Sequence, residues 1–181
     1  CWAFDHEDIA QVRGSSLMEV YNGWPGANNE GGFGKHRAED MWDYVLSTGQ
    51  VIFGVATDDA HHYSDFTHTL ANPGRGWVMV RASELSQGEI VNSLATGQFY
   101  FSTGVELSRV EISDESVSLD IVQYRDYVYR TCFIGKNGVI LSERNDLCPS
   151  YSIRGGEGYI RASIQSSYGT RAWTQPVFLT L

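Results

Sequence analysis

The residues best suited to chemistry follow the apolar run at 51–56, and they are Asp58, Asp59, His61 and His62. Side chains two positions apart in an extended chain point to the same side, so we expect Asp59 and His61 to share one face. A carboxylate and an imidazole that converge at the end of a strand suit a divalent metal ion. The spacing alone also fits the commoner case of a hydrogen-bonded surface histidine.

Two polar residues near the end of an earlier predicted strand could support this pair. Glu19 and Asn22 close the run at 16–22, which we expect to be a strand that enters a loop. Their side chains could orient metal ligands by hydrogen bonding, or they could only cap the loop. Asp58 likewise could hydrogen-bond a ligand or a backbone amide.

The elements that must position these residues alternate between strand and helix up to about residue 104. The apolar runs at 51–56 and 77–80 are typical of parallel strands that are buried on both faces. Helices are predicted at 37–48 and after the capping box at 86–89, whose serine and glutamate satisfy backbone donors at a helix start. This order indicates an α/β layer or part of an α/β barrel, where the carboxyl ends of the strands carry catalysis.

From residue 105 onward the sequence indicates short strands separated by turns. Alternation at 116–121 is typical of a strand with one buried face, and Asn137-Gly138 predicts a hairpin turn because it supplies positive φ angles. Strands are expected at 105–112, 116–122, 127–134, 139–142, 151–153, 158–165 and 171–179. Such a series indicates a small antiparallel β-sandwich, so we predict two domains, 1–104 and 105–181.

Composition and charge limit the classes of function. The chain has 181 residues, a net charge of -9 and an isoelectric point near 4.9. An acidic surface repels phosphate backbones, so nucleic-acid binding through a broad basic patch is not expected. A small anionic substrate held by a metal ion is compatible with this charge. No apolar run reaches the roughly 18 residues of a membrane span, and no signal peptide is apparent, so we expect a soluble chain without a membrane partner.

The three cysteines, Cys1, Cys132 and Cys148, form no CxxC pair, which disfavours a thiolate zinc site. Cys132 and Cys148 could form a disulfide in an exported protein, or they could remain ordinary thiols. The chain begins at Cys1 rather than at a methionine, and two large aromatic residues follow at once. We interpret this start as a cut through a longer reading frame or as a processed terminus.

Several short motifs follow one another in a particular order. They are 19–23 (EVYNG), 42–43 (WD), 46–49 (LSTG), 54–61 (GVATDDAH), 76–80 (GWVMV) and 95–104 (ATGQFYFSTG). In this order and spacing the series resembles the second half of metal-dependent phosphoesterases of the polymerase-and-histidinol-phosphatase (PHP) type. The tail, with 172–176 (AWTQP), is similar to the β-sandwich that follows this domain in some members.

The resemblance implies an incomplete (β/α)7-type barrel followed by a small antiparallel β-sandwich. Enzymes of this family have a two- or three-metal centre and use metal-activated water to attack the phosphorus of a small phosphorylated substrate. In this chain the metal could be zinc, manganese or iron, because nitrogen and oxygen ligands do not decide among them. Asp59 and His61 match the closing D-x-H of the family's ligand set. Glu19, Asn22 and Asp58 would be supporting groups.

The family's opening H-x-H, its next acidic ligand and its further histidines are absent from this sequence. Two ligands cannot hold a hydrolytic centre, so we expect the chain to be inactive alone unless a partner chain completes the site. Missing strands would leave an open sheet edge, which a homo-oligomer could cover.

The alternative hypothesis is a non-catalytic binding module with a vestigial metal site. Its β-sandwich would bind a ligand or a glycan, for which Trp173 is a candidate if it is exposed rather than packed in the core.

Overall fold

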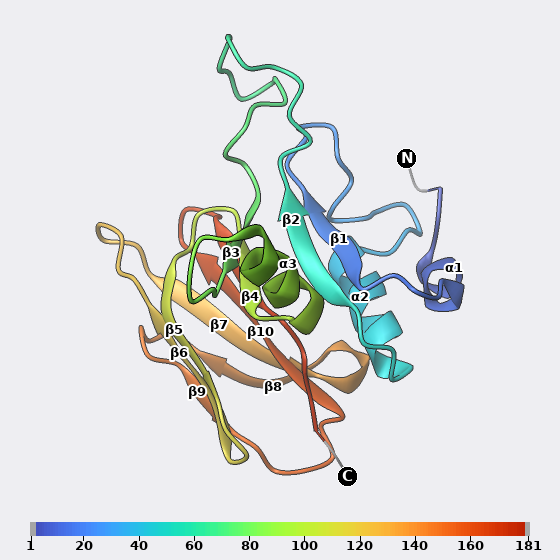
Figure 1. The fold of residues 1–181 in the computed structure, drawn as a ribbon, viewed down its shortest axis with the longest axis vertical. Helices are drawn as coiled ribbons and strands as arrows, with labels where there is room; N and C mark the ends of the chain where they lie inside the picture. Colours follow the sequence, from blue (N-terminus) through green and yellow to red (C-terminus); the bar gives the residue numbers. More distant parts are fainter. Residues whose placement is uncertain (1–2, 180–181) are drawn as a thin grey trace.

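Strands make up most of the regular secondary structure, as the computed structural model of residues 3–179 shows in Figure 1. The largest sheet is antiparallel and has the strand order β3-β4-β11-β10-β7-β8, with β12 paired to β10. Its strands are β3 (Trp77–Val80), β4 (Phe99–Ser102), β7 (Tyr129–Gly135), β8 (Val139–Arg144), β10 (Tyr159–Ser166), β11 (Arg171–Thr174) and β12 (Val177–Phe178).

A three-stranded antiparallel sheet covers one face of the large sheet. Its strands are β5 (Leu107–Ile112), β6 (Ser116–Ile121) and β9 (Ser150–Ser152), in the order β5-β6-β9. The alternation predicted at 116–121 is confirmed, because Val117, Leu119 and Ile121 point into the core between the two sheets. Two sheets packed on a shared apolar core have the architecture of a β-sandwich.

The strands predicted from residue 105 onward are confirmed, with one change. The strand expected at 171–179 is divided into β11 and β12 by Gln175 and Pro176. Proline has no amide hydrogen and therefore interrupts the ladder there. The predicted turn is also confirmed: the 3-10 turn Lys136–Gly138 joins β7 to β8, with Asn137 at a φ of 63°.

The other face of the large sheet is covered by β1 (Leu17–Asn22), α2 (Ala38–Ser47) and β2 (Phe53–Thr57). β1 and β2 pair in parallel, and α2 connects them. Trp42 of α2 packs in a second core with Phe101 and Trp173 of the large sheet. Tyr100 lies in the first core and Phe101 in the second, because successive side chains of a strand point to opposite faces. The short helix α1 (His6–Gln11) lies beside α2.

The prediction of an incomplete (β/α)7-type barrel is wrong. Within residues 3–179 only β1 and β2 form a parallel pair, and β3 joins β4 in an antiparallel pair at the edge of the large sheet. For β3 to pair in parallel with β2, the chain between them would need a crossover connection, usually a helix. Residues 58–76 form an irregular loop instead. The apolar run at 77–80 did not reveal the direction of this strand, because parallel and antiparallel strands can have the same apolar residues. Met79 in this edge strand is in fact exposed.

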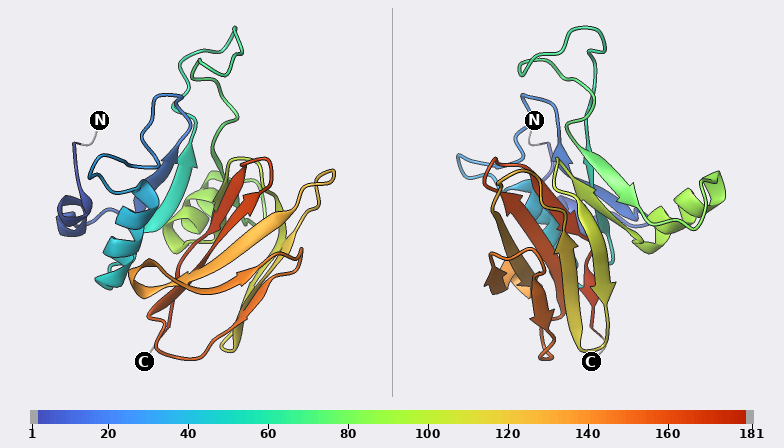
Figure 2. Two further views of the ribbon diagram at one scale, coloured as in Figure 1. Left: turned by 180° about the vertical axis from the view of Figure 1, so that it is seen from behind. Right: turned by 90° about the vertical axis from the view of Figure 1, so that its left-hand side faces the viewer.

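The helix predicted after residue 86 is confirmed as α3 (Gln87–Thr96). The Ser86 hydroxyl accepts a hydrogen bond from the Glu89 backbone N–H, and Gly97 ends the helix at a φ of 73°. The Glu89 carboxylate accepts from Ser83. Figure 2 shows α3 standing out from the large sheet.

A buried ion cluster fastens α2 to the large sheet. Arg161 of β10 is fully buried, and its guanidinium lies 2.8 Å from Glu39 and 2.6 Å from Asp43. Arg171 also pairs with Glu39, and the Tyr159 hydroxyl donates to Asp43. Burial opposes ionisation of Glu39, but the two guanidinium groups outweigh it and lower its pKa from 4.5 to about 2. Charge pairing therefore anchors this helix in addition to apolar contact.

Gln175 fastens β2 to the same sheet. Its amide accepts a hydrogen bond from the Gly54 N–H at 2.9 Å and donates one to the Gly54 carbonyl at 2.8 Å. A side chain at position 54 would collide with Phe101 and Trp42, so glycine is required at this close approach. The large sheet thus includes strands from both sides of residues 104 and 105 and holds the β1-α2-β2 layer on its face.

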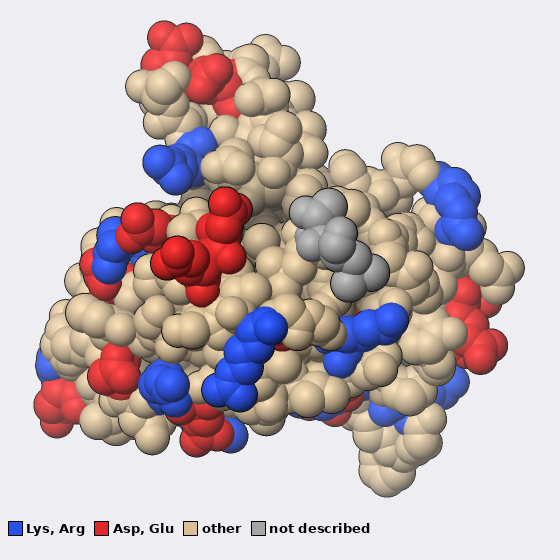
Figure 3. Space-filling model, turned by 90° about the horizontal axis from the view of Figure 1, so that it is seen from below, with Lys and Arg blue, Asp and Glu red and all other residues tan. Residues whose placement is uncertain are grey.

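The surface carries both signs of charge on the face in Figure 3, where Lys and Arg are interspersed with Asp and Glu. Cys132 is buried and Cys148 is exposed, and both are free thiols. Cys1 lies outside the described residues. Among residues 3–179 no helix is long and apolar enough to cross a membrane.

Candidate metal centre

The candidate site lies where the parallel strands β1 and β2 end side by side. Asn22 and Thr57 are paired in register, and the Gly23 N–H donates to the Thr57 carbonyl at 2.7 Å. A Cβ atom on Gly76 would lie 2.6 Å from that same carbonyl oxygen, so the returning chain passes very close to the strand ends. Two parallel strands thereby present their last polar side chains at one edge.

Hydrogen bonds connect these side chains into a chain of polar groups. The Thr57 hydroxyl donates to one oxygen of Glu19. The Asn22 amide donates to the other Glu19 oxygen at 3.2 Å and to an Asp59 oxygen at 3.3 Å. A single amide therefore holds two carboxylates in place. Glu19 and Asn22 are thus connected to Asp59, and their role in orienting metal ligands stays a prediction.

Asp59 and His61 come together, although the backbone does not stay extended between them. β2 ends at Thr57, and Asp59 has a φ of 48°, a left-handed conformation that aspartate tolerates better than most residues. The chain therefore turns at Asp59 and brings the His61 ring back beside it. The His61 Nδ1 lies 2.6 Å from the Asp59 carbonyl oxygen and 3.8 Å from the Asp59 carboxylate.

This contact fixes which nitrogen of His61 is available to a ligand. A carbonyl oxygen can only accept a hydrogen bond, so Nδ1 must carry the hydrogen and donate it. In the neutral ring Nε2 then has the free lone pair, which is the arrangement of many metal-binding histidines. The side chains of His61 and Asp59 are 65% and 42% exposed. Both therefore face solvent, where an ion can reach them.

Asp58 has a different environment from Asp59. Its carboxylate accepts hydrogen bonds from the backbone N–H groups of Gly74 at 3.0 Å, Arg75 at 2.6 Å and Gly76 at 2.8 Å. Partial burial opposes ionisation, but these donors outweigh it and hold the pKa of Asp58 below its ordinary value. The sequence left open whether Asp58 hydrogen-bonds a ligand or a backbone amide, and in the structure it accepts from backbone amides. Asp58 closes the base of the loop at 58–76.

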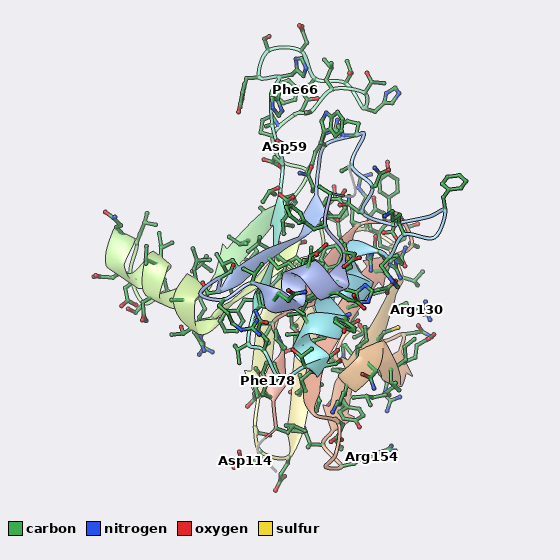
Figure 4. All side chains as sticks on the ribbon, turned by 90° about the vertical axis from the view of Figure 1, so that its right-hand side faces the viewer. Asp59, Phe66, Asp114, Arg130, Arg154 and Phe178 are labelled. Atoms are coloured by element: carbon green, nitrogen blue, oxygen red, sulfur yellow. The ribbon has the colours of Figure 1, made fainter. Side chains whose placement is uncertain are left out.

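That loop projects from the body of the molecule. Figure 4 shows Asp59 where the loop leaves the body and Phe66 further out, at the opposite end from Asp114 and Phe178. Asn72 holds the loop together: its buried amide donates to the carbonyls of His62 and Asp65 and accepts from the Thr67 N–H. The loop therefore has internal structure of its own beside the candidate site.

Sequence reasoning missed Thr57, Asn29 and Asn72. Thr57 stands directly before Asp58, and its position at the end of a strand was the only available signal. Asn29 exchanges two hydrogen bonds with the Asn22 backbone, at 2.9 and 2.8 Å, and so fixes the turn after β1. Neither asparagine has a local pattern that indicates its partner.

Two groups of the kinds that bind metal ions face solvent at this edge. Asp59 offers a carboxylate oxygen and His61 offers Nε2, whereas each oxygen of Glu19 already accepts a hydrogen bond. Within residues 3–179 no group of three or more His, Cys, Asp or Glu side chains is close enough to surround an ion. Comparison with protein-family models, with characterised proteins and with solved structures found no match to this chain.

Proposed function

We propose that Asp59 and His61 are two ligands of a divalent metal ion in a phosphoesterase site. The observation that supports this proposal is the 2.6 Å contact of the His61 Nδ1 with the Asp59 carbonyl, because it leaves the Nε2 lone pair of the neutral ring free, while the Asp59 carboxylate lies 3.8 Å from Nδ1 of the same ring. Zinc, manganese or iron all suit a nitrogen and an oxygen ligand. The bound ion would supply activated water for attack on a phosphate ester.

The residues around the pair would orient it. Asn22 holds an oxygen of Asp59, and Glu19 in turn accepts from Asn22 and Thr57. Two protein ligands are fewer than a hydrolytic centre requires, so further ligands must come from groups outside residues 3–179 or from a partner chain. We therefore propose that this chain is inactive by itself and becomes active when those ligands are added.

Metal titration of the purified chain tests the proposal. We expect Zn²⁺ or Mn²⁺ to bind at about one ion per chain with modest affinity, since only two ligands are provided. Calorimetry should show this binding for the wild type and its loss in an Asp59→Asn/His61→Ala double variant. His62→Ala is the matched control, because this exposed neighbour is not in the proposed ligand set. Equal binding by the wild type and the double variant would exclude the proposed ligands.

The second candidate function is a binding module, and one observation favours it. Tyr63 and Phe66 are exposed on the projecting loop, which has the internal hydrogen bonds of Asn72. Exposed aromatic side chains on an ordered loop are typical of contact residues. A glycan site at Trp173 is no longer part of this candidate, because that ring is only 1% exposed and is stacked on Phe101. A Tyr63→Ser/Phe66→Ser variant should keep metal binding if the loop serves only contacts.

A further inference from the structure

A hollow of about 390 Å³ lies directly beside the supporting residues of the candidate site. It is bounded by α1, β1, the start of α2 and the loop after β1. We propose that this hollow binds the uncharged, apolar alcohol portion of a phosphate-ester substrate. The proposal rests on the proposed function, since it adds a substrate class to the same site.

The lining of the hollow combines many apolar side chains with a few polar ones. The apolar side chains are Phe4, Ile9, Val12, Leu17, Met18, Met41 and Ile52, and the polar residues beside Glu19 and Asn22 are Ser15, Asn28 and Asn29. Small-molecule sites commonly have this composition, in which apolar walls give contact area and a few polar groups fix the orientation. The volume also lies in the usual range for such sites.

The charge of the lining determines which part of the substrate fits. Glu19 is the one charged residue that lines the hollow, and no lysine, arginine or histidine does so within the described chain. A phosphate or carboxylate placed here would meet a carboxylate and no cation, which is unfavourable in a partly desolvated site. The phosphate must therefore lie outside, and the portion within the hollow carries no negative charge; the predominance of apolar side chains in the lining favours an uncharged group.

The hollow adjoins the candidate metal centre through Asn22. Asn22 and Glu19 line the hollow, and the same Asn22 amide donates to Asp59 at 3.3 Å. Asp59 and His61 are not among the described residues that line the hollow, so the proposal requires the ester to extend from the hollow past Asn22 toward Asp59. This arrangement separates two tasks, because the apolar walls bind the alcohol and the metal ligands bind the phosphate.

The exposed apolar side chains at the border of the hollow favour binding of an apolar ligand. Phe4, Val12 and Leu17 are 70%, 48% and 36% exposed, so large apolar side chains border an open hollow. An apolar ring inserted between them removes this surface from water, which is favourable. A sugar or a nucleotide would gain much less from the same walls.

Binding of 2-naphthol to the whole chain, in buffer with a metal chelator, tests the hollow without depending on the metal. We expect saturable binding, seen as a change in naphthol fluorescence, and no competition by glucose. Val12→Glu and Leu17→Glu should each weaken binding about tenfold or more, because a carboxylate would be placed among the apolar contacts. Val139→Glu, on the far strand β8, is the matched control and should change nothing. Circular dichroism confirms that each variant is folded.

A second arm uses 2-naphthyl phosphate with Zn²⁺ and separates the two proposals. We expect the phosphate ester to bind more tightly than naphthol, and the Asp59→Asn/His61→Ala variant to lose only that added affinity. Naphthol binding without any gain from phosphate and Zn²⁺ would support the hollow and contradict the phosphoesterase. No naphthol binding, or binding that both glutamate variants leave unchanged, would overturn the hollow. So would a dimer that Val12→Glu converts to monomers without naphthol binding, since the hollow would then be a protein interface.

Discussion

At the scale of single residues, two neighbouring carboxylates have separate roles. Asp58 points toward the returning chain and accepts three backbone hydrogen bonds, whereas Asp59 faces solvent beside His61. The turn at Asp59, with its φ of 48°, causes the difference because it reverses the direction of the second side chain. Asp58 therefore shapes the loop, and Asp59 is the residue available to an ion.

Replacing each aspartate by asparagine should separate these roles. Asp58→Asn should lower the free energy of unfolding by about 2 kcal/mol, because it removes charge-assisted hydrogen bonds and turns an amide N–H₂ toward backbone donors. Asp59→Asn should change it by about 0.5 kcal/mol or less, because the site is exposed and asparagine tolerates the left-handed conformation. Urea unfolding at pH 7 measures both. Equal losses would contradict the assignment.

The pH dependence of the Asp58 effect follows from its pKa, which is lower in the folded chain than its ordinary value of 3.8. Folding is therefore stabilised by Asp58 above that ordinary pKa, and the contribution is lost as the pH falls through the folded pKa. The difference between wild type and Asp58→Asn should accordingly shrink when unfolding is measured at pH 3.

At the scale of elements, the position of the candidate site depends on how α2 and β2 are held. α2 is anchored by Glu39 and Asp43 on Arg161, and β2 by Gly54 on Gln175. Arg161 lies in β10 and Gln175 lies between β11 and β12, and both are more than 100 positions later in the chain than the residues they hold. The ends of β1 and β2 are thus placed by contacts with the sandwich.

Replacing the buried Arg161 should lower the free energy of unfolding much more than replacing the exposed Arg130. Arg161→Met leaves Glu39 and Asp43 in a site with less positive charge, so we expect a loss of about 3–5 kcal/mol. Arg130→Met is the matched control, because Arg130 forms an exposed pair with Glu143 and should contribute about 1 kcal/mol or less. Urea denaturation gives both values. Similar losses would show that the buried cluster is not the anchor.

At the scale of the whole molecule, the three layers form one packed body. The large sheet contributes side chains to both cores, with Tyr100 in one and Phe101 in the other. Its strands come from both sides of residues 104 and 105, which the sequence suggested as a domain boundary. The core of the β1-α2-β2 layer is therefore shared with strands from the later part of the chain.

This arrangement predicts a single cooperative unfolding transition. Far-UV circular dichroism follows all sheets, while the fluorescence of the five tryptophans includes Trp42 and Trp173, which lie in the second core. The two curves should coincide in urea, as expected for a two-state domain. A Gln175→Ala variant should shift both curves together. Separate midpoints would show that 1–104 and 105–181 unfold independently.

The sequence by itself determined the features that depend on neighbouring residues. Ser86 and Glu89 marked a helix start, Asn137 and Gly138 marked a turn, and the alternation at 116–121 marked a buried strand face. The proximity of Asp59 and His61 could also be predicted, because only Ala60 lies between them in the chain and even a fully extended chain keeps them close. Short-range sterics and hydrogen bonding decide all of these.

Tertiary structure alone decided how the strands pair and which charges are buried. The run at 77–80 is equally apolar in a parallel or an antiparallel sheet, and only the course of the loop before it made β3 antiparallel. Arg161 has no local sign of burial, because its partner Asp43 lies 118 positions earlier. Pairing direction and long-range ion pairs depend on which surfaces meet when the layers pack, and no local pattern encodes that choice.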